Sequence, residues 1–70
     1  LTLKWVMREP RPGESLDGPA LPVSTIVRQA ARTAIASEHP IRVMDGDTML
    51  GVVDEEDIMR VVVAEEEAHT

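Results

Sequence analysis

The sequence PIRVMDGDTMLGVVDEEDIMR, residues 40–60, contains the clearest structural signals in this chain. Ile41 and Val43 fall on one face of a strand by the period of two that strands impose on their side chains. Asp45-Gly46 is typical of a two-residue hairpin turn, because both residue types tolerate positive φ angles. A second strand is predicted over residues 49–53, so this stretch predicts a β-hairpin.

An acidic run, Asp54-Glu55-Glu56-Asp57, follows the predicted hairpin and precedes residues 58–63, which are apolar apart from Arg60. This order predicts a capped helix start that packs back on the hairpin. Free N–H groups at a helix start can also hold a phosphate or a ribose. Here the crowded carboxylates stabilise the helix through its dipole and repel a phosphate, so the sequence favours a structural role over a ligand site.

Another helix is predicted upstream, from Ser24 or Thr25 to about Ser37, because alanine dominates this segment and either hydroxyl residue can cap it. His39-Pro40 ends the helix, since the residue before a proline is driven out of the α region. Its apolar stripe consists of small side chains and suits close packing within the chain or against a second helix. The stripe comprises Val27, Ala30, Ala31, Ala34 and Ile35.

The first 22 residues are predicted to be an N-terminal arm and a proline-rich linker, and residues 23–70 a single folded domain. Residues 1–7 alternate imperfectly and suit either a short strand or an ordered lead-in. Residues 9–22 hold four of the five prolines and two of the four glycines, which disfavours regular structure there. This composition favours a mobile segment over one that wraps the domain.

The length and the composition limit the size of the fold and the classes of partner. A chain of 70 residues forms at most one small domain of marginal stability, which self-association would increase. Trp5 is the one aromatic residue, so the chain has no platform for stacking nucleic-acid bases. The net charge of −6 also disfavours nucleic acids and anionic membranes as partners. No apolar run approaches the ~20 residues that cross a bilayer, so no direct membrane insertion is expected.

The charges are unevenly distributed along the chain. Residues 1–37 carry five basic and three acidic side chains, whereas residues 38–70 carry two basic and ten acidic side chains. The two halves therefore differ in sign, about +2 against −8, which suits either a self-complementary surface or a solvated acidic face. Without cysteine the chain has no disulfide framework, and it is compatible with the cytosol.

The sequence gives little support for catalysis or for metal binding. No arrangement of serine, histidine and aspartate indicates a nucleophilic site, so the chain is not expected to be an enzyme. Asp45-Gly46-Asp47 superficially resembles a calcium loop. The twelve-residue ladder of ligands and its terminal glutamate are not in register, however, so these aspartates are assigned to turn chemistry and no metal is expected.

Residues 40–60, together with Val23-Ser24-Thr25-Ile26 and the alanine-rich helix that follows, resemble the CBS domain, a regulatory module with the order β-α-β-β-α. The lead-in LTLKWVMR and its proline-rich spacer resemble the C-terminal part of the ATP-binding subunits of glycine betaine/proline-type ABC importers. The resemblance implies an α+β fold with a small sheet packed on two helices. It also implies a homodimer, because CBS motifs associate in twos.

In the CBS family the cleft between paired motifs binds adenosine-containing ligands. The resemblance assigns the ribose to Asp57, the phosphate to the position of Asp54, and the base to the backbone around Pro40, Ile41 and Val23. The family has serine or threonine where this chain has Asp54. This carboxylate and the two glutamates after it disfavour AMP and ATP, and they leave a neutral nucleoside, a cyclic dinucleotide or no ligand as the expected alternatives.

These inferences together predict a non-enzymatic regulatory module of a larger cytoplasmic protein. The expected parent is the ATPase subunit of an osmoprotectant importer, held at the membrane through the transporter complex. The module is expected to sense a ligand or the ionic strength, with no certain cofactor. Its expected partners are a second copy and the ATPase domain of the same parent chain. The alternative is a dimerisation module with no small-molecule ligand.

Overall fold

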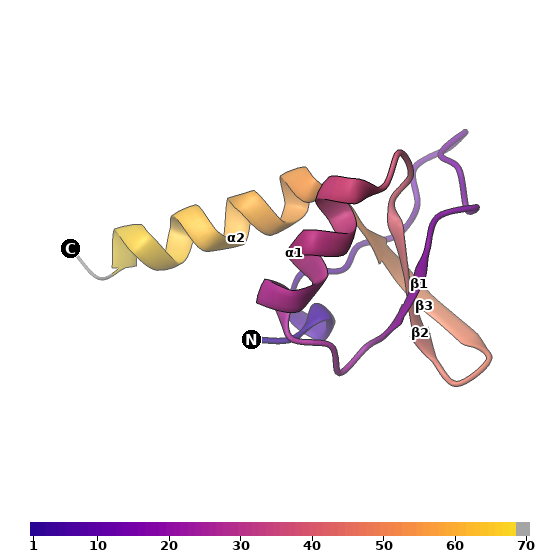
Figure 1. The fold of residues 1–70 in the computed structure, drawn as a ribbon, viewed down its shortest axis with the longest axis horizontal. Coiled ribbons are helices and arrows are strands. Elements are labelled where there is room, and N and C mark those ends of the chain that lie inside the picture. Colours follow the sequence, from indigo (N-terminus) through magenta and orange to yellow (C-terminus); the bar gives the residue numbers. More distant parts are fainter. Residues whose placement is uncertain (69–70) are drawn as a thin grey trace.

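The computed structural model describes residues 1–68, which form a three-stranded sheet and two α-helices (Figure 1). The predicted α+β class and the order β-α-β-β-α are confirmed. A short 3-10 helix, η1, precedes these elements. The bounds are η1 Leu3–Trp5, β1 Ala20–Pro22, α1 Val27–Ala36, β2 Ile41–Asp45, β3 Thr48–Val53 and α2 Glu55–Ala68.

The sheet has the order β1-β2-β3, with β1 parallel and β3 antiparallel to the central strand β2. Both helices lie on the same side of the sheet, and the second half of α2 extends beyond the rest of the molecule (Figure 1). The core between sheet and helices is aliphatic, as expected from the scarcity of aromatic residues. It contains Leu3, Val6, Val27, Ala30, Ala34, Ile41, Val43, Val53 and Ile58.

The hairpin between β2 and β3 forms where it was predicted, but its turn lies one residue later. Asp45 pairs with Thr48, so Gly46 and Asp47 are the loop residues. Only Gly46 has a positive φ, +59°, which glycine adopts at no steric cost. The expected pair Asp45-Gly46 was wrong because Asp45 is still part of the strand.

A β-bulge interrupts the pairing of β2 with β3. The register steps from Val43 opposite Gly51 to Met44 opposite Met49, which leaves Leu50 as the extra residue. A bulge changes which face the following side chains occupy. Gly51, Val52 and Val53 are therefore buried in succession, which no period of two predicts.

The first strand, β1, lies inside the segment that was predicted to lack regular structure. Proline fits here because β1 is an edge strand, where a missing N–H donor need not break a ladder. The Arg42 N–H donates to the Pro19 carbonyl (2.7 Å), and the Val23 N–H donates to the Met44 carbonyl (2.8 Å). The prediction that residues 9–22 hold no regular structure was therefore wrong at its C-terminal end.

The N-terminal arm packs into the same core as the rest of the chain. Leu3 is 0% exposed and Val6 is buried beside it. The Leu3 N–H donates to the Thr25 carbonyl (3.0 Å), and the Val27 N–H donates to the Leu1 carbonyl (2.9 Å). The predicted boundary at residue 22 consequently does not separate two packing units, because the hydrophobic contacts cross it.

Helix α1 begins later than expected. Its N-cap is Ile26, which makes no side-chain cap, and neither Ser24 nor Thr25 takes that role. The arm compensates by supplying the Leu1 carbonyl to the first turn. Most of the predicted stripe faces the core, but Ile35 is 68% exposed. Across residues 1–68, neither helix combines the length and the apolar character that a membrane span requires.

Candidate functional site

A cluster of one arginine and three carboxylates lies where the arm meets the start of α2. The Arg8 Nε donates to Asp57 Oδ2 (2.9 Å), and its Nη2 donates to Asp54 Oδ2 (3.0 Å). Nη1 and Nη2 also form a bidentate pair with the Glu14 carboxylate (2.7 and 2.8 Å). Bidentate pairs of this kind are among the stronger charge-assisted hydrogen bonds. We call these four side chains the Arg8 cluster.

The backbone fixes Arg8 at this position. The Arg8 N–H donates to the Val52 carbonyl (2.9 Å), and the Val52 N–H donates to the Arg8 carbonyl (2.8 Å). This pair places the arm beside β3 as a one-residue bridge. A Cβ at Gly51 would lie 2.7 Å from the Arg8 carbonyl oxygen, so the close approach of the arm requires glycine there.

The first turn of α2 is closed by a reciprocal cap. The Asp57 N–H donates to Asp54 Oδ1 and the Asp54 N–H donates to Asp57 Oδ2, both at 2.9 Å. This is the geometry of a capping box, with aspartate in both positions. The predicted capped helix start is confirmed. Asp57 Oδ2 accepts from both the Asp54 N–H and Arg8, whereas Asp54 uses Oδ1 for the cap and Oδ2 for Arg8.

The contacts in the cluster shift the pKa values of Arg8, Glu14 and Asp54 in the direction that favours their charged forms. Hydrogen bonding to Arg8, followed by the Arg11 N–H, lowers the pKa of Glu14 to about 2. Burial acts to raise the pKa of Asp54, but the hydrogen bonds from Asp57 and Arg8 outweigh it and the net pKa is lowered. The Glu14 hydrogen bond is the main reason that the pKa of Arg8 is raised.

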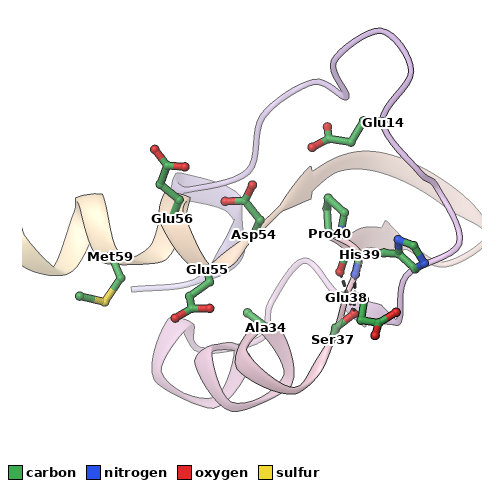
Figure 2. Close-up of a pocket in the computed structure, with 10 residues that line it drawn as sticks. All are labelled: Glu14, Ala34, Ser37, Glu38, His39, Pro40, Asp54, Glu55, Glu56 and Met59. Carbon is green, nitrogen blue, oxygen red and sulfur yellow. Dashed lines mark hydrogen bonds between the residues drawn. The ribbon is translucent and has the colours of Figure 1, made fainter.

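An open cleft of about 570 Å³ lies beside the cluster, between the C-terminal end of α1 and the start of α2 (Figure 2). Of the five residues that the resemblance assigned to a ligand, Pro40 and Asp54 line this cleft. The other three predicted site residues do not. Asp57 is 4% exposed, Ile41 is fully buried in the core, and the Val23 side chain is half-buried against the core.

The cleft is strongly acidic. Five of its lining residues carry carboxylates, and no lysine or arginine is among the described residues that line it. Figure 2 shows the acidic side chains of the arm, of the α1–β2 loop and of α2 around the opening. A phosphate is disfavoured in such a field. The carboxylates are Glu14, Glu38, Asp54, Glu55 and Glu56.

Sequence reasoning missed Arg8 and Glu14, which complete the site. Arg8 lies far from the start of α2 in the sequence, 49 residues before Asp57, so no local pattern connects them. Two signals point to them nevertheless. Three carboxylates at one helix start require a cation nearby if any of them is buried, and a glycine inside a strand indicates a close backbone approach.

Within residues 1–68, no group of three or more histidines, cysteines, aspartates or glutamates is arranged to hold a metal ion. The carboxylates at the start of α2 instead accept hydrogen bonds from Arg8 and from backbone N–H groups. Their arrangement is that of an ion cluster that holds two segments of chain together.

No protein-family model matches this sequence, and no curated protein or solved structure matches it significantly. The resemblance to the CBS domain therefore stays a prediction that depends on the element order and on the residues named above.

Proposed function

We propose that this chain is a regulatory module of the CBS type that responds to ionic strength through the Arg8 cluster. Its proposed setting is a larger cytoplasmic protein, the ATPase subunit of an osmoprotectant importer, which a transporter complex holds at the membrane. The proposed partners are a second copy of the module and the ATPase domain of the same parent chain.

The observation that carries this proposal is the position of Arg8 between two parts of the chain. Its side chain is 18% exposed and pairs at once with the arm, through Glu14, and with the start of α2, through Asp57 in its first turn and Asp54 directly before it. Ion pairs that are partly open to water weaken as salt is added. Rising ionic strength should therefore loosen the arm from α2.

The response should be local. Leu3 and Val6 anchor the arm in the core by hydrophobic contacts, which salt does not weaken. The Arg8 cluster, in contrast, depends on charge. Salt should thus release residues near Arg8 while the core stays folded, and this change in the arm is the signal that the module would transmit.

The geometry argues against an adenosine-type ligand at Asp57. Its carboxylate is nearly inaccessible and already accepts bonds from Arg8 and from the Asp54 N–H. A ribose at Asp57 Oδ2 would have to displace Arg8, and weakening the ion pairing of a buried carboxylate is costly, since Arg60 Nη1 lies 3.5 Å from its other oxygen. AMP and ATP would in addition meet the acidic cleft.

A thermal-shift series tests this choice. Wild-type protein is heated in KCl from about 0.1 M to about 1 M, over which the Debye length falls from about 10 Å to about 3 Å. In parallel it is heated with adenosine, AMP, ATP or cyclic di-AMP. We expect the unfolding temperature to respond to KCl more in wild type than in Arg8→Met, and to none of the ligands.

A ligand present at about 100 times its Kd would add ~2.7 kcal/mol of stability, so binding would be evident. A shift with any of the four ligands contradicts the ionic-strength proposal and favours a ligand sensor. Equal salt responses of the wild type and Arg8→Met contradict it as well. That result, without a ligand shift, favours the second candidate, a dimerisation module with no sensing role, which the closed state of Asp57 also supports.

A further inference from the structure

Both helices carry apolar side chains that the chain itself does not cover. Ile35 on α1 and Met59 and Val63 on α2 are exposed. Between the helices lies a groove of about 900 Å³. Its walls include the apolar residues Leu1, Ile26, Ala31, Ile58 and Val62, and charged side chains lie along it.

The second half of α2 is a poor helix on its own. Residues 61–63 are three consecutive valines, whose branched side chains lower helix propensity. Glu65 and Glu66 oppose the helix dipole near its C-terminal end. This half projects beyond the rest of the molecule (Figure 1). A helix with these features is stabilised mainly by packing, so another surface should cover it.

The charges on this face identify the surface that fits. Arg28 and Arg32 on α1 are exposed, line the groove and form no ion pair with any described residue. Glu65 lines the same groove from α2 and Glu66 follows it; both are exposed and make no ion pair within residues 1–68. A second copy offers the complementary charges twice. In a two-fold interface the arginines of each copy face the glutamates of the other copy.

We propose that a second copy docks through this helix face, with its α2 laid along the groove and its Glu65 and Glu66 against Arg28 and Arg32. The two-fold axis generates the same contacts a second time, with the roles of the two copies exchanged. The docked helix covers the apolar residues Ile26, Ala31 and Val62 along the groove. This inference rests on the proposed pairing of two copies and specifies the surface that forms it.

Charge reversal tests the docking by sedimentation equilibrium. One double variant is Arg28→Glu with Arg32→Glu, and the other is Glu65→Lys with Glu66→Lys. We expect each variant alone to dimerise at least about tenfold more weakly than wild type, equivalent to ~1.4 kcal/mol. An equimolar mixture of the two should recover a dimer, because the reversed charges again meet their opposites.

The variants are chosen so that loss of folding does not imitate loss of docking. The glutamate introduced at position 28 would stand in the first turn of α1, and the lysines introduced at positions 65 and 66 would stand in the last turns of α2, where these charges favour the helix dipole. The double change Asp45→Lys with Asp47→Lys is the matched control. It alters the net charge as the α2 variant does, but at the exposed hairpin turn, and should leave the dimer intact.

The outcomes separate this inference from the function proposed above. A wild-type dimer that neither double variant weakens, or a mixture that does not recover it, overturns the helix-face docking and leaves the pairing itself in place. A wild type that stays monomeric at all concentrations tested overturns both. The salt response of the arm is measured independently of either result.

Discussion

Replacing Arg8 by methionine should remove a large part of the stability of this domain. Methionine keeps an unbranched chain of similar length but leaves Glu14, Asp54 and Asp57 without their shared cation. Exposed ion pairs contribute about 0.2–1 kcal/mol, whereas breaking a buried pair costs about 3–5 kcal/mol. The Arg8 cluster lies between these limits, because Asp57 is buried and Asp54 is half-buried.

We therefore expect Arg8→Met to lower the free energy of unfolding by about 2–3 kcal/mol at pH 7. A chain of this size is stable by roughly 3.5–10 kcal/mol, so the loss is a substantial fraction. It corresponds to a fall in Tm of roughly 10–20 °C. Arg11→Met is the matched control. Arg11 lies in the same arm and is exposed, and it is its backbone N–H that bonds to Glu14, so we expect a change below about 0.5 kcal/mol.

The pH dependence of the stability difference between the wild type and Arg8→Met is a second, sharper test. Arg8 lowers the pKa of Glu14 to about 2 from an ordinary value of about 4.5, and it helps to lower the pKa of Asp54. A lowered carboxyl pKa contributes stability above the unfolded-state pKa, and this stability is lost as the pH falls toward the folded-state pKa. The gap between the wild type and Arg8→Met should thus narrow between about pH 5 and about pH 2.

Urea unfolding at a series of pH values measures both quantities in one experiment. The reasoning is refuted if Arg8→Met matches Arg11→Met at pH 7. It is refuted equally if the gap between wild type and Arg8→Met stays constant, or widens, on acidification. Either result would mean that hydrophobic contacts and backbone hydrogen bonds hold the arm without a contribution from the Arg8 cluster.

Three further substitutions probe the same architecture. Glu14→Gln removes a carboxylate of lowered pKa, so the stability of this variant should depend less on pH between about 4.5 and about 2 than that of the wild type. Acid titration followed by circular dichroism measures this dependence. The same acid unfolding curve in both proteins would contradict the pairing of Glu14 with Arg8. Gly51→Ala places a Cβ 2.7 Å from the Arg8 carbonyl oxygen, a backbone atom that cannot move alone. It should lower the free energy of unfolding by about 1–3 kcal/mol in urea. An unchanged free energy of unfolding would show that the arm does not approach β3. Leu3→Ala should cost about 2–5 kcal/mol because this side chain is fully buried, while a loss below about 0.5 kcal/mol would mean that the arm is not part of the core.

The elements that could be predicted from the sequence are those with local signals. The hairpin and the start of α2 depend on residues within a few positions of one another, and the Asp54–Asp57 cap spans three. The turn was misplaced by one residue because Asp45-Gly46 and Gly46-Asp47 both suit a tight turn. The bulge at Leu50 carries no comparable local signal.

The position of the arm could not be predicted in the same way. The imperfect alternation of residues 1–7 left a short strand and an ordered lead-in open, and the proline-rich composition of residues 9–22 does not indicate contacts made far along the chain. Leu3 and Val6 are buried by α1 and the sheet, and Arg8 reaches carboxylates 46 and 49 residues away. The candidate site was therefore predicted only in part. Asp54 and Pro40 line the cleft, but Arg8, which pairs with Asp54 and Asp57, comes from the predicted N-terminal arm.

The most direct test of the proposed response to ionic strength is amide hydrogen exchange at the reciprocal bridge between Arg8 and Val52, followed by NMR as KCl rises from about 0.1 M to about 1 M. The amides of Ile41 and Val43 in the central strand are the internal reference. We expect exchange at the bridge to accelerate roughly fivefold, equivalent to ~1 kcal/mol, while exchange in the central strand stays constant. Exchange at the bridge that does not change with salt, or that changes in step with the central strand, would contradict the account.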